Sequence, residues 1–163
     1  MPQSFDPIYA GNWEALNEFL SGIVSEEDLA GILASVAAVD WHMIGAPGEP
    51  PFQSEFSNLG PPWAAAGFRH TLNNTVYLQG SVTHPADFDP QSTWLPIFQL
   101  PLELKPLGSI QFGCISNDNS MSKIVVWEDG TVIWGGYITG TFVSNIPYVS
   151  LGGVSFSVGA SAT

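Results

Sequence analysis

The chain has 163 residues, of which 45% are hydrophobic and 12% aromatic, so it can bury a core and is not expected to be disordered. Fifteen Asp and Glu residues against three Lys and Arg give a formal net charge of −12. This charge excludes an electrostatic footprint for nucleic acid and disfavours contact with anionic lipid. Only 11% of the residues are charged whereas Gly (17) and Pro (13) are abundant, a composition that favours a mainly β body.

The sequence offers no disulfide framework and no Cys-based zinc site, because Cys114 is its one cysteine. We expect this thiol to be buried and inert. The N-terminus lacks the basic region and apolar run of a signal peptide, and no apolar run is long enough to span a bilayer. We therefore expect a protein that is made in the cytosol and is not inserted into a membrane.

Residues 1–45 are predicted to form an acidic helical module. Asn12 can cap a first helix, and Ser25 can begin a second one whose acidic first turn complements the helix dipole. Both helices are too short to be stable alone, so their apolar stripes must pack against another surface. This surface could belong to the β body, to a second copy of the chain or to another protein. The predicted contact residues are Trp13, Leu16, Phe19, Leu20, Leu29, Ile32, Leu33 and Val36.

Residues 1–60 hold nine of the fifteen acids and neither Lys nor Arg. Two interpretations stay open for these acids: a surface for a basic partner, or an ordinary solvated helix face. Residues 46–62 are predicted as a linker or irregular arm, because Pro and Gly recur there and end with Gly60-Pro61-Pro62.

Residues 63–163 are predicted to form an antiparallel β-sandwich of the jelly-roll type. The first hairpin spans residues 68–83 and turns at Asn73-Asn74, with apolar and polar residues alternating along its second strand. Gly80 falls on the apolar face, which indicates a bulge or the close approach of another backbone.

The following segments continue the predicted sheet. Two prolines in residues 94–104 suit an edge or bulged strand. Further strands are predicted over residues 109–116, 123–127, 131–134, 137–143 and 148–158. Asp129-Gly130 is the strongest hairpin signal, and Gly152-Gly153 marks a turn or bulge. Trp127 and Trp134 are assigned to packing, since this hairpin is apolar on both faces.

Five short segments occur in a characteristic order. They are Gly67-Phe68-Arg69, TVYLQG at 75–80, a Leu-Pro strand that ends at Lys105-Pro106, Asp-Gly-Thr-Val at 129–132, and the VSLGGVSF run at 149–156. The ordered set resembles the C-terminal β domain of minor tail proteins, tail fibres and head fibres of tailed phages. The resemblance implies a structural protein of the virion, commonly trimeric, with its β domain at an exposed tip. It carries over no catalytic residue.

The sequence has no Gly-x-Ser-x-Gly, no His-Glu-x-x-His and no phosphate-binding glycine loop, so we expect neither an enzyme nor a cofactor. His84, Asp87 and Asp89 could hold a metal, but such clusters are usually polar turns, and we expect no metal site. Three aromatic residues near predicted turns, Trp94, Tyr137 and Tyr148, are candidates for stacking on a glycan or anchoring a protein receptor. The alternative for each is packing in the core or a subunit interface.

These observations predict a minor tail or tail-fibre component of a bacteriophage virion, assembled in the host cytoplasm. Its β knob would serve host attachment, and its N-terminal helices would dock on other virion proteins of the tail or capsid. The expected partners are two further copies in a homotrimer and a host cell-surface glycan. A capsid decoration or head-fibre protein with a purely structural role is the alternative. A carbohydrate-binding module is a third reading that the helical module does not favour.

Overall fold

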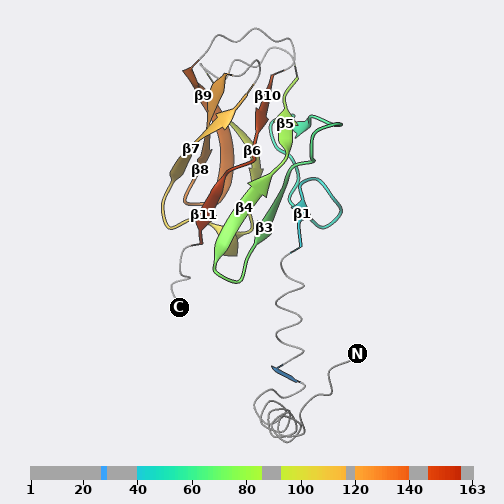
Figure 1. Ribbon diagram of the computed structural model, residues 1–163, viewed down its shortest axis with the longest axis vertical. Helices are drawn as coiled ribbons and strands as arrows, with labels where there is room; N and C mark the ends of the chain where they lie inside the picture. Colours follow the sequence, from blue (N-terminus) through green and yellow to red (C-terminus); the bar gives the residue numbers. More distant parts are fainter. Residues whose placement is uncertain (1–26, 29–39, 86–92, 117–119, 140–146, 159–163) are drawn as a thin grey trace, which may run out of the picture. The chain divides into compact units, whose positions relative to one another are not determined.

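The computed structural model describes residues 27–28, 40–85, 93–116, 120–139 and 147–158 (Figure 1). The chain divides into two compact units, Met1–Ala38 and Val39–Thr163. In the first unit the described residues are Glu27 and Asp28, which are helical and exposed. The other residues of the predicted helical module up to residue 39, including its contact residues from Trp13 to Val36, lie outside the described residues. The last part of the module, residues 40–45, is described and contains β1 instead of a helix.

The second unit is mainly β, as predicted, and its described strands form three antiparallel sheets (Figure 1). The first sheet has the order β1-β3-β4-β11, the second β10-β5-β2, and the third β6-β9-β8-β7. The strands are β1 (His42–Met43), β2 (Ser57–Asn58), β3 (Gly67–His70), β4 (Thr75–Gln79), β5 (Ser81–Thr83), β6 (Leu95–Gln99), β7 (Ile110–Ile115), β8 (Met121–Val126), β9 (Thr131–Thr139), β10 (Tyr148–Ser150) and β11 (Ser155–Ser157). A 3₁₀ turn at Leu102–Leu104 follows β6.

All three sheets contribute to one hydrophobic core. Phe68, Val76, Leu78 and Phe156 come from the first sheet, Val82 and Val149 from the second, and Ile97, Phe98, Ile124, Val126, Val132 and Trp134 from the third. The alternation predicted for residues 75–83 is confirmed along β4, where Val76 and Leu78 are buried and the polar residues are partly exposed. In β5 Val82 is buried as predicted, but Ser81, predicted on the polar face, is buried too. The core therefore lies between sheets that come from distant parts of the chain.

The unit begins earlier than the sequence predicts. β1 pairs with β3, and β2 pairs with β5, so residues on both sides of the predicted linker belong to sheets. Ile44 and Phe56 are buried in the core. The Pro and Gly residues of this segment shape turns that return the chain to the body, as at Gly45 and Gly48, which have φ of 82° and 85°. Residues 46–62 therefore form an irregular part of the β unit, and they do not separate it from the rest.

The hairpin at Asp129-Gly130 is confirmed. Gly130 has φ of 90°, and the Thr131 amide donates a hydrogen bond of 2.9 Å to Asp129 Oδ1. This hydrogen bond from the Thr131 amide, together with one from the Thr131 side chain, holds the pKa of Asp129 below its usual value. The turn before β4 is longer than the predicted two residues, running from Thr71 to Asn74, and its positive φ (58°) falls on Asn74.

β6 lies at one edge of its sheet, and its register with β9 shifts between Pro96 and Phe98. This matches the edge or bulged strand predicted from the prolines, because a proline cannot donate a ladder hydrogen bond. The strand is shorter than predicted, since the chain leaves the sheet after Gln99 and enters the 3₁₀ turn at Leu102.

Cys114 on β7 is 4% exposed, which confirms the prediction of a buried thiol. Burial raises its pKa from 9.0 to about 11, because the thiolate would lose its hydration. We expect the native protein at pH 8 to react with a thiol reagent such as DTNB at least about 100-fold more slowly than the unfolded chain. The rate of thionitrobenzoate release with and without guanidinium chloride measures this ratio. Equal rates would show that Cys114 is accessible.

Candidate binding site

Residues 59–66, between β2 and β3, form a loop that is fixed to β5 by backbone hydrogen bonds. The Leu59 amide donates to the Ser81 carbonyl (3.0 Å), and the Ser81 amide donates to the Ala64 carbonyl (3.1 Å). At the end of the loop, the Ala66 amide donates to Asn58 Oδ1 at 2.6 Å. The loop is thus held at both ends and in its middle, so a side chain that projects from it has a defined position.

Gly80 allows the loop to lie directly on the junction of β4 and β5. Its φ is +89°, and a Cβ there would lie 2.3 Å from the Ala65 carbonyl oxygen. Real Cβ atoms do not approach a backbone oxygen so closely, so any side chain would displace the loop. This confirms the close backbone approach predicted at Gly80.

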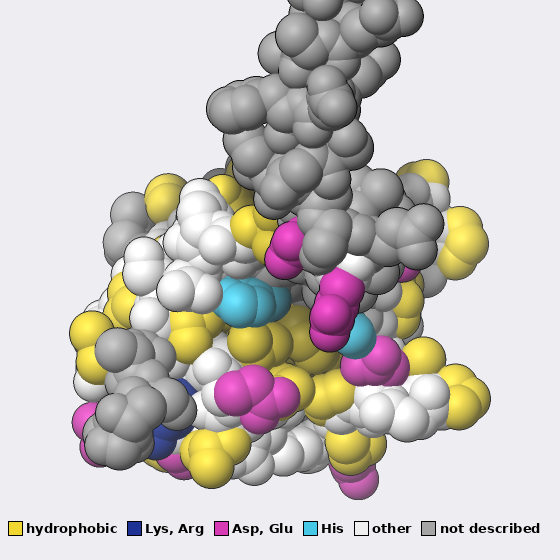
Figure 2. All heavy atoms as spheres, turned by 90° about the horizontal axis from the view of Figure 1, so that it is seen from below, with side chains coloured by type: hydrophobic (Ala, Val, Ile, Leu, Met, Phe, Trp, Pro, Cys, Tyr) yellow, Lys and Arg dark blue, Asp and Glu magenta, His cyan; other side chains and the backbone are white. Residues whose placement is uncertain are grey.

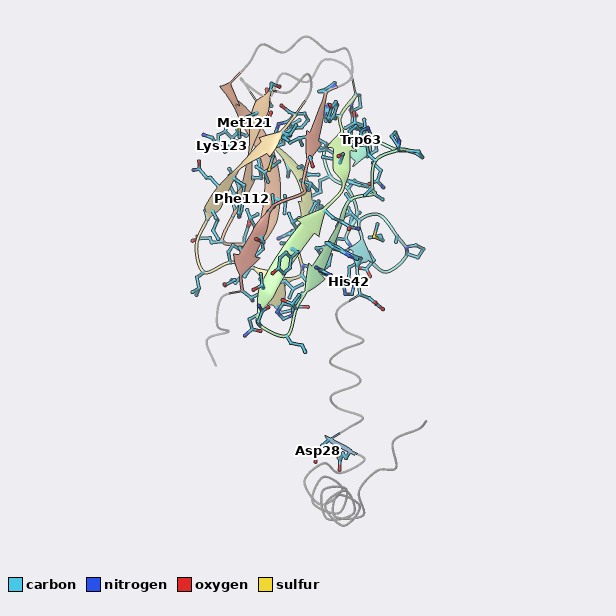
Figure 3. All side chains as sticks on the ribbon, viewed as in Figure 1. Asp28, His42, Trp63, Phe112, Met121 and Lys123 are labelled. Atoms are coloured by element: carbon cyan, nitrogen blue, oxygen red, sulfur yellow. The ribbon has the colours of Figure 1, made fainter. Side chains whose placement is uncertain are left out.

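Trp63 projects from this loop and is 53% exposed (Figure 3). Its ring stacks on that of Tyr148, with centroids 6.2 Å apart and an interplanar angle of 27°. Tyr148 is paired across the second sheet with Thr83, and Thr83 with Ser57. Paired residues of antiparallel strands point to the same face, so the stacked rings adjoin two side-chain hydroxyls. We call Trp63, Tyr148, Thr83 and Ser57 the Trp63 platform.

The platform has the composition of a surface for sugars or for an amphipathic protein segment. Aromatic faces bind the apolar faces of sugar rings, and hydroxyl groups both donate and accept hydrogen bonds. Thr83 Oγ1 already donates to the Pro147 carbonyl at 2.8 Å, which orients its remaining lone pairs. A ligand would therefore meet a preformed site.

The three aromatic residues proposed from sequence do not form one site. Tyr148 belongs to the Trp63 platform in the second sheet, whereas Trp94 precedes β6 in the third. Trp94 is 45% exposed, and its ring lies on the backbone of Gly135, where an added Cβ would be 2.5 Å from Trp94 Cγ. Tyr137 lies on β9 opposite Ser122, and its side chain lies outside the described part of the structure.

Sequence reasoning missed Trp63, although a tryptophan directly after Gly60-Pro61-Pro62 is a signal for an aromatic residue presented by a rigid loop. It also misplaced Trp127. Trp134 is buried as predicted, but Trp127 is 44% exposed because it lies beyond the end of β8, at the hairpin turn. The hairpin itself is buried on both faces, since Val125 and Ile133 are also buried.

Charged residues make up 11% of the sequence. Figure 2 shows one face of the molecule, with Asp and Glu (magenta) spread among hydrophobic side chains and a small area of Lys or Arg (dark blue). Within the described ranges, no three His, Cys, Asp or Glu side chains gather as a metal site would require. Asp87 and Asp89 of the candidate metal loop lie outside these ranges.

Searches with protein-family models, among curated proteins and among solved structures found no match. In the described part of the chain, no helix has the length and hydropathy needed to cross a bilayer. The fold and the site define a mainly β protein in which Trp63, on a loop held by backbone hydrogen bonds, stacks on Tyr148 of β10.

Proposed function

We propose that the chain is a structural protein of a tailed-phage virion, a minor tail or tail-fibre component whose β unit attaches to the host surface. The observation that carries this proposal is the Trp63 platform. The Trp63 side chain is half exposed, and exposing its apolar ring to water is unfavourable. The loop nevertheless holds the ring in this position by backbone hydrogen bonds, without burying it in the core. Its position is useful when a ligand covers it.

The finer architecture belongs to the same proposal. The three sheets would form a jelly-roll-like sandwich that acts as a knob, and the acidic unit Met1–Ala38 would be the helical part that docks on tail or capsid proteins. The ordered sequence segments that resemble phage β domains support this arrangement. The host ligand would be a cell-surface glycan, since the platform combines aromatic rings with hydroxyl groups.

The exposed pair Ile115 and Met121 supports assembly into a homotrimer. These residues are cross-strand neighbours on β7 and β8, and they are 61% and 38% exposed. Adjacent exposed apolar side chains on a sheet are typical of a subunit contact. They also favour the second candidate function, a capsid decoration or head-fibre protein in which exposed apolar residues serve only assembly.

Replacing Trp63 with alanine in the full chain tests the attachment role. We expect binding to bacterial cell envelopes and to a glycan array to fall at least about tenfold, which corresponds to about 1.4 kcal/mol. Trp127→Ala is the matched control, because Trp127 is similarly exposed but lies on another loop. Labelled protein on a panel of envelopes, with circular dichroism to check folding, provides the measurement.

Two results would contradict the attachment role. Equal loss of binding in the Trp63→Ala and Trp127→Ala variants would show that the Trp63 platform is not the site. If the wild-type protein bound none of the envelopes and none of the glycans, the purely structural alternative would be favoured.

A further inference from the structure

Arg69 lies between two aromatic rings on the outer face of the first sheet. Its Cζ is 4.9 Å from the centroid of the Trp41 ring and 5.2 Å from that of the Tyr77 ring. Trp41 directly precedes β1 and Tyr77 lies on β4, and β1 and β4 are the strands that flank β3. Two cation–π contacts therefore restrain the guanidinium.

This guanidinium has no anionic partner within the described residues. The ion pair between His42 and Glu49, at 2.8 Å, does not involve Arg69. Arg69 Nε is buried without a hydrogen-bond partner, and no other hydrogen bond of the Arg69 side chain is found in that part of the chain. A carboxylate would satisfy the donors of this guanidinium, and the acids of the described residues do not supply one.

The face around Arg69 also lacks acids. Core residues such as Phe68, Val76 and Phe156 point inward, and the residues that alternate with them point outward. The outward positions of β3, β4 and β11 are Gly67, Arg69, Thr75, Tyr77, Gln79, Ser155 and Ser157. None of these described positions is acidic, and most carry a hydroxyl or an amide.

We propose that Arg69 binds the carboxylate of an acidic sugar. The Trp41 and Tyr77 rings both contact the guanidinium and Nε is buried, so the two terminal Nη groups are the donors left for recognition, and together they match a planar carboxylate. Gln79, Ser155 and the Tyr77 hydroxyl group lie on the same face and can pair with sugar hydroxyls. That the carboxylate belongs to a sugar rests on the proposed attachment to host glycans.

Arg69 is the only arginine in the sequence, which makes a direct test possible. Its Nε–H gives a single side-chain resonance in a ¹H–¹⁵N spectrum of the full chain, and burial of Nε slows exchange with water. We expect sodium glucuronate to shift this resonance with saturation in the millimolar range. Glucose, which lacks the carboxylate, should not shift it, and acetate should need at least about tenfold higher concentration.

Variants connect the binding to this residue. Tryptophan fluorescence should report glucuronate binding in the wild type and in the control variant Lys123→Gln. This variant also removes a cation that lies over an indole, because Lys123 Nζ lies over the ring of Trp94. Arg69→Gln should lose the response, and Arg69→Lys should weaken binding at least about fivefold because an ammonium lacks the planar fork. Circular dichroism shows whether each variant is folded, and the Nε–H titration of the wild type does not depend on any variant.

The inference would be wrong if glucuronate caused no saturable shift of the Arg69 Nε–H resonance, or if acetate and glucuronate shifted it at equal concentrations. It would also be wrong if a peptide of residues 1–40 bound more tightly than glucuronate, because the site would then serve the acidic segment of the chain itself. Envelope binding that depends on Trp63, without any effect of glucuronate on Arg69, would refute this site and leave the attachment role intact. Glucuronate binding without envelope binding would refute the attachment role instead.

Discussion

Replacing Gly80 with alanine is expected to lower the free energy of unfolding by about 2–6 kcal/mol. This loss is the sum of two costs, the strain of a side chain at a positive φ and the displacement of a packed backbone. The φ of Gly80 is +89°, and the new Cβ would meet the carbon and oxygen of the Ala65 carbonyl at 2.4 and 2.3 Å. Neither atom belongs to a flexible side chain. The loop that carries Trp63 must therefore move, and we expect the Trp63–Tyr148 stack to be lost with it.

Gly153→Ala separates the two contributions. Gly153 has φ of +91°, but no heavy atom lies within 4 Å of a Cβ built there, so this variant carries the conformational cost alone. We expect it to lose about 1–3 kcal/mol. Guanidinium chloride unfolding followed by tryptophan fluorescence compares both variants with the wild type. If Gly80→Ala were no less stable than Gly153→Ala, the contact with Ala65 would contribute nothing.

A chain that starts at residue 63 is expected not to fold, whereas a chain that starts at Val39 should unfold cooperatively. The shorter chain loses two buried side chains, Ile44 and Phe56, worth about 1.5–3 kcal/mol each. It also loses backbone hydrogen bonds to the body, including that from Gln53 to the Ile97 carbonyl, at about 0.5–1.5 kcal/mol each. The sum approaches the total stability of a typical domain, about 5–15 kcal/mol.

Circular dichroism and the dispersion of amide resonances would distinguish the two truncated chains. Phe56→Ala in the full chain provides an independent check, with an expected loss of about 3–5 kcal/mol for an aromatic side chain removed from a core. Cooperative unfolding of residues 63–163 at the same denaturant concentration as residues 39–163 would contradict the assignment of residues 39–62 to the β unit.

Local patterns in the sequence were sufficient for several elements. Alternation along β4 identified the buried face, Asp129-Gly130 identified a hairpin, and Gly80 indicated a close backbone approach. Each of these features depends on residues near one another in the chain, or on one residue with an unusual backbone conformation. Local preference is therefore informative there.

Other features depend on pairings between distant residues. β1 and β2 have two residues each, too few for any periodic pattern, and their pairing with β3 and β5 gives residues 39–62 their place. The stacking of Trp63 on Tyr148 joins residues 85 positions apart. No local preference encodes such contacts, so the candidate site could be predicted only in part, through Tyr148.

The sequence by itself determined the mainly β class, the acidic charge and the strongest turns, because composition and local spacing decide them. Only the tertiary structure decided which aromatic residues are exposed and which are stacked, because burial depends on the strands that happen to lie alongside. Arg69 illustrates the difference. Its sequence neighbours predict only a strand residue, whereas the tertiary structure brings its guanidinium to the rings of Trp41 and Tyr77.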